Sequence, residues 1–212
     1  MAKLIFFDDG HTYQADGETV PSVSEIIRFM SREVYDSIMQ FRLDNAADRG
    51  TKVHKAVENI ARYGSCEVTE DIEPYVRAYV QFLKDKRPQW LKVEHAMYSD
   101  ALGYAGTMDR YGVIDGRRLV VDVKSNSQIK VPIVGAQLNG YDILAEENGL
   151  PADGVAVLHL MKNGLYRFKE LPIDSASFMA CLTLHNALKK KPRKKKPEVS
   201  DGTADTDSIA GE

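Results

Sequence analysis

Residues 106–125, GTMDRYGVIDGRRLVVDVKS, decide the fold that we expect, because they read as two strands joined at Asp115–Gly116. An Asp-Gly dipeptide between such segments is the strongest short-range signal for a two-residue β-hairpin. Counting outward from the turn pairs Ile114 with Arg117, and each further pair lies one residue farther along both strands. The stretch therefore predicts an antiparallel hairpin with a defined register.

Two carboxylates face one another if this register continues, since Asp109 then lies opposite Asp122. Side chains alternate between the two faces of a strand, so Lys124 shares the face of Asp122. Like charges directly opposed destabilise a sheet, and the arrangement therefore requires a cation between the carboxylates. Two hard oxygen ligands favour Mg²⁺ or Mn²⁺. A bulge or a longer turn would move Asp109 away from this pair.

A simple ion pair explains part of the same pattern without a metal. Asp122 and Lys124 could pair with each other on a surface hairpin. The apolar residues Val120 and Val121 weigh against this alternative, because a half-buried strand end is a poor place for unpaired charge. The hairpin alone leaves both interpretations open.

The composition limits the class of protein. A chain of 212 residues suits one domain, which we expect over residues 1–188 with a core at about 45–170. The net charge of −3 means that any nucleic-acid binding must come from a local patch. Two cysteines are too few for a disulfide scaffold, a four-cysteine zinc site or an iron–sulfur cluster. No apolar run approaches the roughly 20 residues that a membrane helix needs, no signal-peptide pattern is present, and we expect a cytoplasmic protein.

The segments before the hairpin predict strands and then helices. Residues 3–20 read as two short strands around the glycine turns, and a helix follows with Ser22 or Ser24 as its cap. Residues 35–63 have helical periodicity, which Arg49-Gly50 interrupts and could divide into two helices. A further helix is expected at 71–86, before Pro88.

The segments around and after the hairpin predict an α/β sheet. Strands are expected at 91–99 and 154–162, with an amphipathic helix at 131–149 as the crossover to a parallel neighbour. A last strand at 164–173 and a helix at 175–190 follow, and no Walker or Rossmann glycine pattern is present.

The C-terminal tail divides into two parts. Its basic block, residues 189–196, either contacts phosphates or is merely solvated. The polar and acidic remainder up to residue 212 has almost nothing to bury, and we expect it to be disordered.

Two further pairs of residues lie four apart on predicted helices. His54 and Glu58 share one helical face, where they could form an ordinary surface hydrogen bond or belong to a site. Gln137 and Tyr141 lie on the helix after the Asp-X-Lys strand, where an interfacial amide and a packed tyrosine are the structural alternative. Neither pair is specific by itself.

Taken in order, four motifs resemble the RecB-type branch of the PD-(D/E)XK nuclease superfamily. The motifs are RGTKVHKAVE, YAGTMD, VVDVKS and QLNGY, and the N-terminal HTYQADGETVPSVSEII is similar to the leader of phage-encoded exonucleases of this group. The resemblance implies a restriction-endonuclease-like core, with a mixed central β-sheet flanked by helices and an N-terminal helical region.

The resemblance also implies roles for individual residues. Asp109, Asp122 and the carbonyl of Val123 would hold Mg²⁺ or Mn²⁺, and His54 would add a nitrogen ligand. Lys124 would take the role of the family's lysine, orienting or deprotonating the attacking water.

Four other residues receive less definite roles from the resemblance. Gln137 and Tyr141 would match the motif that lies beside the DNA. Glu58 would orient His54 or bind a second metal. Glu94 lies on the preceding strand, where the family often has an acidic residue.

The implied activity is that of a metal-dependent deoxyribonuclease, an exonuclease on linear DNA in recombination, repair or phage DNA metabolism. Its partner would be DNA with free ends, in a bacterial or phage-infected cell. Without helicase motifs the chain would act with a separate recombinase, annealing protein or helicase. The alternatives are an endonuclease of the same fold, a non-catalytic nucleic-acid-binding protein and a hydrolase of small phosphates.

Overall fold

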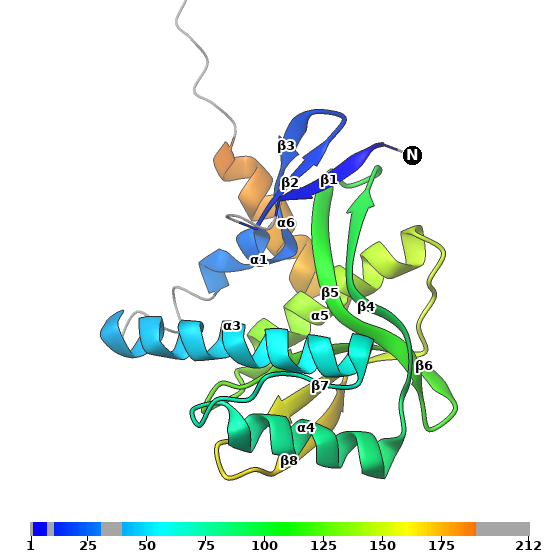
Figure 1. Ribbon diagram of the computed structural model, residues 1–212. Coiled ribbons are helices and arrows are strands. Elements are labelled where there is room, and N and C mark those ends of the chain that lie inside the picture. Colours follow the sequence, from blue (N-terminus) through cyan, green and yellow to red (C-terminus); the bar gives the residue numbers. More distant parts are fainter. Residues whose placement is uncertain (1, 8–10, 31–39, 190–212) are drawn as a thin grey trace, which may run out of the picture.

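The computed structural model (Figure 1) describes residues 2–7, 11–30 and 40–189, and only the backbone of residues 40–47. Its centre is a five-stranded sheet in the order β4-β5-β6-β7-β8, and a separate three-stranded sheet lies at the N-terminus. Helices flank the five-stranded sheet, so the fold class predicted from the sequence is confirmed. No helix in these ranges is both long and apolar enough to cross a membrane.

The central sheet is mixed. Its strands are β4 (Gln89–Ser99), β5 (Tyr104–Ile114), β6 (Arg117–Lys124), β7 (Gly154–Leu160) and β8 (Tyr166–Leu171). Neighbouring strands are antiparallel except for β6 and β7, which run parallel. Helix α5 (Val131–Glu147) makes the connection between these two, and this confirms the predicted crossover.

The hairpin between β5 and β6 has the predicted register. Asp115 and Gly116 both have positive φ, 51° and 79°, as a type I′ turn requires. The register then runs from Ile114 opposite Arg117 to Arg110 opposite Val121. The next positions along the two strands are those of Asp109 and Asp122.

The N-terminal sheet has three strands, so the prediction of two was wrong. They are β1 (Leu4–Phe7), β2 (Thr12–Ala15) and β3 (Glu18–Val20). Asp16 and Gly17 have φ values of 49° and 86°, and this turn folds β3 back onto β2. The turn was expected, but the strand after it is too short to show a pattern.

Most helices lie where the sequence predicts them, with one exception, and the predicted helical residues 35–39 lie outside the described part of the chain. Ser22 caps α1 (Val23–Ile26) by accepting a hydrogen bond from the N–H of Glu25. Helix α3 (Gln40–Tyr63) continues through Arg49–Gly50, so the predicted division into two helices does not occur. A glycine inside a helix costs only about 1 kcal/mol, which the burial of apolar residues farther along α3 offsets.

The remaining helices are α4 (Glu73–Lys86) and α6 (Ser175–Lys189). Helix α4 ends before Pro88, at Arg87, whose φ of 44° is left-handed. The tail after Lys189, with most of the basic block, lies outside the described residues. Lys189 itself forms an ion pair with Glu25, with 3.1 Å between nitrogen and oxygen.

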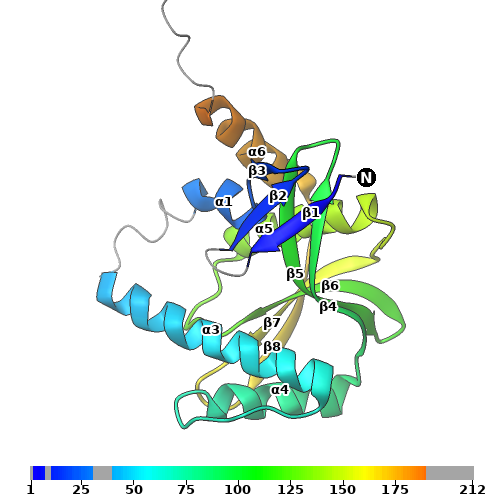
Figure 2. The ribbon, with the colours of Figure 1, turned by 45° about the horizontal axis from the view of Figure 1, so that its top comes forward.

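The two faces of the central sheet carry separate hydrophobic cores. Helices α1, α5 and α6 cover one face, where Val120 and Val155 are buried. Helices α3 and α4 cover the other, where Val121 and Val123 are buried. In Figure 2 these two groups of helices lie on either side of the strands. Alternation along β6 therefore places Asp122 and Lys124 on the face of α5.

Candidate metal-binding and catalytic site

A cleft of about 500 Å³ lies at the end of β6, between α3, α5 and the N-terminal sheet. Its lining includes the side chains of His54, Glu58, Asp109, Asp122, Lys124, Gln137 and Tyr141. Every residue that the sequence assigned to a site through its side chain therefore lines one cleft. Glu94, Thr107 and His11 line it as well.

Three side chains in the cleft place ligand atoms close to one another. One atom each of His54, Glu94 and Asp109 lies within 4.8 Å of the other two. The nitrogen Nδ1 of His54 is 3.6 Å from Oδ2 of Asp109. One imidazole and two carboxylates suit a divalent cation such as Mg²⁺ or Mn²⁺, with the nitrogen favouring Mn²⁺. The donor set therefore fits the metal that the sequence implied.

Asp109 is fixed by the neighbouring strand. Its Oδ2 accepts a hydrogen bond from the backbone N–H of Val123 over 2.7 Å, and only 8% of the residue is exposed. The other part of the Val123 prediction, coordination of a metal by its carbonyl oxygen, stays a prediction. The hydrogen bond holds the carboxylate beside His54 at the point where the two strands enter the cleft.

Glu94 reaches the site through an unusual backbone conformation. It lies between the pairs Val93–Arg110 and His95–Met108, hence opposite Asp109. Its φ of 46° is strained for a glutamate in a strand, and such strain is typical of functional positions. The sequence singled out Glu94 only through the resemblance, and the structure includes it in the cluster of possible ligands.

A fully buried arginine holds Glu94 in place. Nη1 of Arg110 donates to Oε1 of Glu94 over 3.0 Å and to the backbone carbonyl of Asp109 over 2.6 Å. Burial and the nearby charge of Asp109 raise the pKa of Glu94 to about 8, although Arg110 opposes this rise. Sequence reasoning missed Arg110, because nothing in a strand pattern shows that a charged residue is buried.

Asp122 and Lys124 form a second unit of the cleft. Nζ of Lys124 lies 2.9 Å from Oδ1 and 2.8 Å from Oδ2 of Asp122, whose exposure is 1%. Burial raises the pKa of Asp122 to about 6; Lys124 lowers it, and Asp109 raises it further. The ion pair considered from the sequence exists, but it lies inside the cleft. Asp122 is outside the group of three possible ligands.

Gln137 and Tyr141 form the wall of the cleft on α5. Nε2 of Gln137 donates to the Tyr141 hydroxyl over 3.2 Å. Burial, together with the charges of Asp109 and Asp122, raises the pKa of Tyr141, so its hydroxyl stays protonated. Tyr141 also packs closely over Gly106, where an added Cβ would come within 2.8 Å of its ring.

Glu58 has partners other than His54. Its carboxylate binds Nζ of Lys55 at 3.0 Å and Nε of Arg62 at 2.8 Å. Burial would raise the pKa of Glu58, but these two hydrogen bonds lower it overall. Neither the orientation of His54 nor the binding of a second metal by Glu58 is tested by these contacts, and both stay predictions.

The N-terminal sheet contributes to the opening of the cleft. The hydroxyls of Tyr13 and Thr107 lie 2.8 Å apart and join β2 to β5. His11, which precedes β2, lines the same opening. Sequence reasoning did not single out these residues, because their place in the cleft depends on how two sheets pack together.

No protein-family model and no curated protein matches the chain. Among solved structures, it is similar to the alkaline exonuclease LHK-Exo from Laribacter hongkongensis at 11% identity and a TM-score of 0.39, over 65% of this chain and 78% of that one. The complex of LHK-Exo with dAMP gives 11% and 0.42, over 80% and 87%. A structure of SSO0001 gives 15% and 0.41, over 81% and 77%. These similarities are too low to assign a family.

Proposed function

We propose that this protein is a divalent-metal-dependent deoxyribonuclease that hydrolyses phosphodiester bonds, acting as an exonuclease on linear DNA. The observation that carries the proposal is the meeting of His54, Glu94 and Asp109 with the Asp122–Lys124 pair in one cleft. We assign residues 1–188 to the nuclease domain, and residues 189–212 to the basic block and the acidic tail.

His54, Glu94 and Asp109 hold the cation, with Asp122 on the adjoining strand. When bound, Mg²⁺ or Mn²⁺ supplies an activated water and neutralises charge on the scissile phosphate. Arg110 keeps Glu94 aimed at this position by the 3.0 Å hydrogen bond. The three donors come from α3, β4 and β5, so the folded sheet and helix α3 are both required to assemble them.

Lys124 has the chemistry to act on the attacking water and on the phosphate. Its ammonium is held by Asp122 at the end of β6, and 20% of its side chain is exposed. From there it orients the water and places positive charge beside the oxygen on which negative charge develops. The buried carboxylate of Asp122 fixes the direction of the ammonium group, because it contacts Nζ through both oxygens.

Gln137 and Tyr141 act on the position of the substrate. The protonated Tyr141 hydroxyl accepts from Gln137 and retains its own proton to donate. A hydroxyl that retains a proton to donate suits a phosphate oxygen of the DNA backbone. These two residues therefore orient the strand without taking part in bond breaking.

The exonuclease part of the proposal is supported by the sequence resemblance of the four motifs. The finer features, a cytoplasmic location and a separate recombinase, annealing protein or helicase as partner, follow from the same resemblance. We include both in the proposed function.

A digestion of linear and covalently closed circular duplex DNA with Mg²⁺, Mn²⁺ or EDTA tests the function. We expect loss of the linear DNA alone, with either metal but not with EDTA. Nicking of the closed circle would replace the exonuclease by an endonuclease. Absence of cleavage in all conditions, with retained DNA binding, would indicate a non-catalytic binding protein.

A further inference from the structure

A row of basic side chains crosses the sheet from the cleft to its edge. Lys124 on β6 lies opposite His159 on β7, and His159 lies opposite Arg167 on β8. Neighbouring strands are about 4.8 Å apart, and paired residues point to the same face. The row therefore leads away from Lys124 in two steps, on the face of the sheet that carries Asp122.

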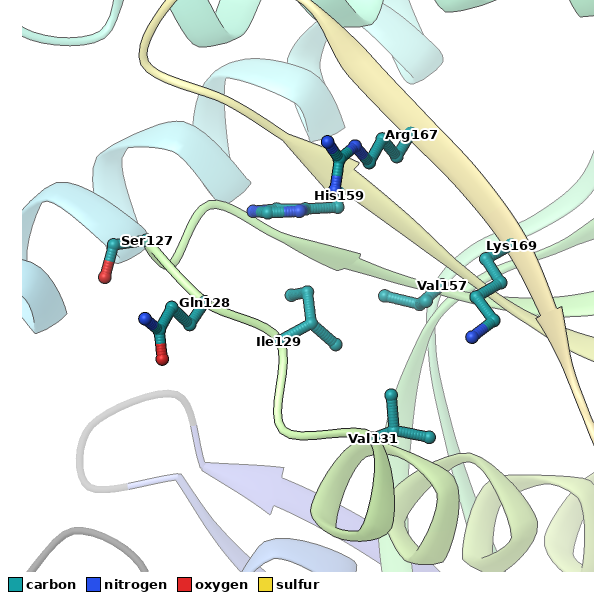
Figure 3. A pocket seen from close by; sticks show the side chains of 8 residues that line it. All are labelled: Ser127, Gln128, Ile129, Val131, Val157, His159, Arg167 and Lys169. Carbon is teal, nitrogen blue, oxygen red and sulfur yellow. The ribbon is translucent and has the colours of Figure 1, made fainter.

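The row continues into a groove of about 370 Å³ next to the cleft (Figure 3). One wall is the loop before α5, with Ser127 and Gln128, and the other is formed by β7 and β8. Figure 3 shows His159 beside Arg167 on one side of the groove and Lys169 farther along β8. The apolar side chains in the lining are Ile129, Val131 and Val157.

The lining of this groove contains basic and polar residues but no carboxylate. Among the residues that the structure describes, Arg167 and Lys169 form no ion pair. The adjoining cleft, by contrast, has several carboxylates. Cations without an acidic partner, next to an acidic metal site, form an attractive surface for an anionic chain.

A second groove of about 440 Å³ adjoins the first and shares Ser127 and His159 with it. Its lining adds Arg49 and Lys162 and again contains no carboxylate. Nε of Arg49 is buried without a hydrogen-bond partner in the described part of the chain, and its guanidinium lies over the Tyr75 ring at 5.6 Å. The positive surface therefore extends beyond one pair of side chains.

The loop that forms the wall is fixed to the row. Nε2 of His159 lies 2.7 Å from the carbonyl oxygen of Asn126, and a carbonyl can only accept, so Nε2 carries the proton. This bond holds the loop over β7 directly after Lys124. The hydrogen bond therefore fixes the position of this wall relative to β7.

We propose that the groove between the loop 126–130 and strands β7 and β8 binds the sugar-phosphate backbone of a single nucleic-acid strand, on one side of the scissile phosphate. Arg167 and Lys169 contact its phosphates, and Ile129 and Val157 pack against sugar or base. The proposal rests on the proposed function, because the row begins at Lys124.

The size of the groove favours a single strand over a duplex. A volume of about 370 Å³ is that of a site for one drug-sized ligand, comparable to a nucleotide unit. A positively charged groove that follows the backbone is also part of the usual pattern for binding single strands.

The test compares Arg167→Gln/Lys169→Gln with the control Lys84→Gln/Lys92→Gln, which removes the same charge. Lys84 lies on α4, against the opposite face, and Lys92 on the opposite edge strand β4. Binding of a fluorescent single-stranded DNA is measured in EDTA at several salt concentrations. Single-turnover cleavage with Mn²⁺ is measured separately, as a function of protein concentration.

We expect the groove variant to bind roughly tenfold more weakly, as for the loss of a hydrogen bond to a charged group. The slope of log affinity against log salt should fall by about 0.7 for each lost phosphate contact. In cleavage, half-saturation should shift to higher protein concentration while the maximal rate is retained. The control should match the unmodified protein in all three.

Three outcomes would overturn the inference. Binding and salt slope equal to those of the control would show that the groove does not contact the strand. If the groove variant lost as much affinity for blunt duplex DNA as for single-stranded DNA, the groove would not be restricted to a single strand. If inorganic phosphate, at the concentration that half-saturates the groove, displaced the single-stranded DNA completely, the groove would be a site for free phosphate. If the protein cleaves no DNA but the groove variant still loses strand binding, the nuclease proposal fails and this inference stands.

Discussion

The backbone N–H of Val123 donates a hydrogen bond to Oδ2 of Asp109 over 2.7 Å. The same carboxylate oxygen lies 3.6 Å from Nδ1 of His54. One oxygen thus joins the strand β6, the strand β5 and the helix α3. The position of this carboxylate depends on the hairpin register, and the possible metal site depends on its charge.

Asp109→Asn separates these two contributions. The amide retains an oxygen that accepts from Val123, so the midpoint of thermal unfolding should change little, whereas Mn²⁺ affinity should fall by more than about tenfold. Calorimetric titration with Mn²⁺ and thermal unfolding in EDTA measure the two effects. Asp115→Asn, at the exposed hairpin turn, is the matched control. Unchanged Mn²⁺ affinity in Asp109→Asn would remove Asp109 from the site.

Above the raised pKa of Glu94, at about pH 9, Arg110→Met should destabilise the protein by about 3 kcal/mol, because it leaves the partly buried, ionised Glu94 carboxylate without its cation. The double variant Arg110→Met/Glu94→Gln should recover part of this loss, since the unpaired charge is then removed as well. Urea unfolding of the two single variants and the double variant gives the coupling between the residues. Additive effects would show that the 3.0 Å ion pair does not hold Glu94.

The stability of the metal-free protein should depend on the protonation of Glu94. Its pKa is raised to about 8 in the folded protein, from an ordinary value of 4.5. Folding is therefore favoured by the protonated form: this contribution is complete below the ordinary pKa and is lost as the pH rises through about 8. Asp122 behaves in the same way, but its contribution is lost earlier, around its raised pKa of about 6.

Urea unfolding in EDTA between about pH 6.5 and pH 8.5 isolates the contribution of Glu94. The free energy of unfolding should fall with rising pH by at most about 1.4 kcal/mol per unit, and Glu94→Gln should flatten this slope. Added Mn²⁺ should stabilise the protein more at the upper end, because the ligand must be deprotonated. A slope that Glu94→Gln leaves unchanged would assign it to another group.

The register of the hairpin was predictable because its turn chemistry is local. Asp115 and Gly116 both need positive φ, and the pairs up to Arg110 and Val121 follow by counting. The wall of the cleft on α5 was predictable for a similar reason, because Gln137 and Tyr141 lie one helical turn apart and therefore share one face of the helix. Local periodicity thus gave most of the strands and helices around the cleft.

The place of Glu94 was not predictable from local patterns. The register of β4 shifts between Trp90 and Lys92, and the chain then adopts a left-handed conformation at Glu94 itself. An irregular strand changes which residues face the cleft, and no periodicity in the sequence marks it. The burial of Arg110 was hidden in the same way, because it depends on the packing of α4 against the sheet.

Gly106→Ala should disturb the wall formed by Tyr141. A Cβ at this position would lie 2.8 Å from Cε1 of Tyr141 and 2.9 Å from Cγ2 of Val23, so these side chains must shift. We expect the free energy of unfolding to fall by about 1–3 kcal/mol and the cleavage of DNA to be slower. Gly135→Ala on α5 is the control, because its Cβ would meet nothing within 4 Å and alanine favours a helix. Equal stability and cleavage in both variants would contradict the close packing.

Lys124→Met should lower the rate of DNA cleavage by a factor of about 10²–10⁴, the usual contribution of a positioned acid or base. Mn²⁺ affinity should be retained, because His54, Glu94 and Asp109 do not include this residue. The single variant also leaves the buried Asp122 carboxylate without its ammonium partner and should be less stable for that reason.

The double variant Lys124→Met/Asp122→Asn separates chemistry from stability. It removes both charges of the pair, so the free energy of unfolding should recover while cleavage stays low. Single-turnover cleavage at saturating protein, urea unfolding and Mn²⁺ titration are measured on the single and double variants. If cleavage recovered together with stability, neither the ammonium of Lys124 nor the carboxylate of Asp122 would act in the reaction and the pair would serve only the fold, because a group that acts on the water or the phosphate cannot be replaced by restoring the fold.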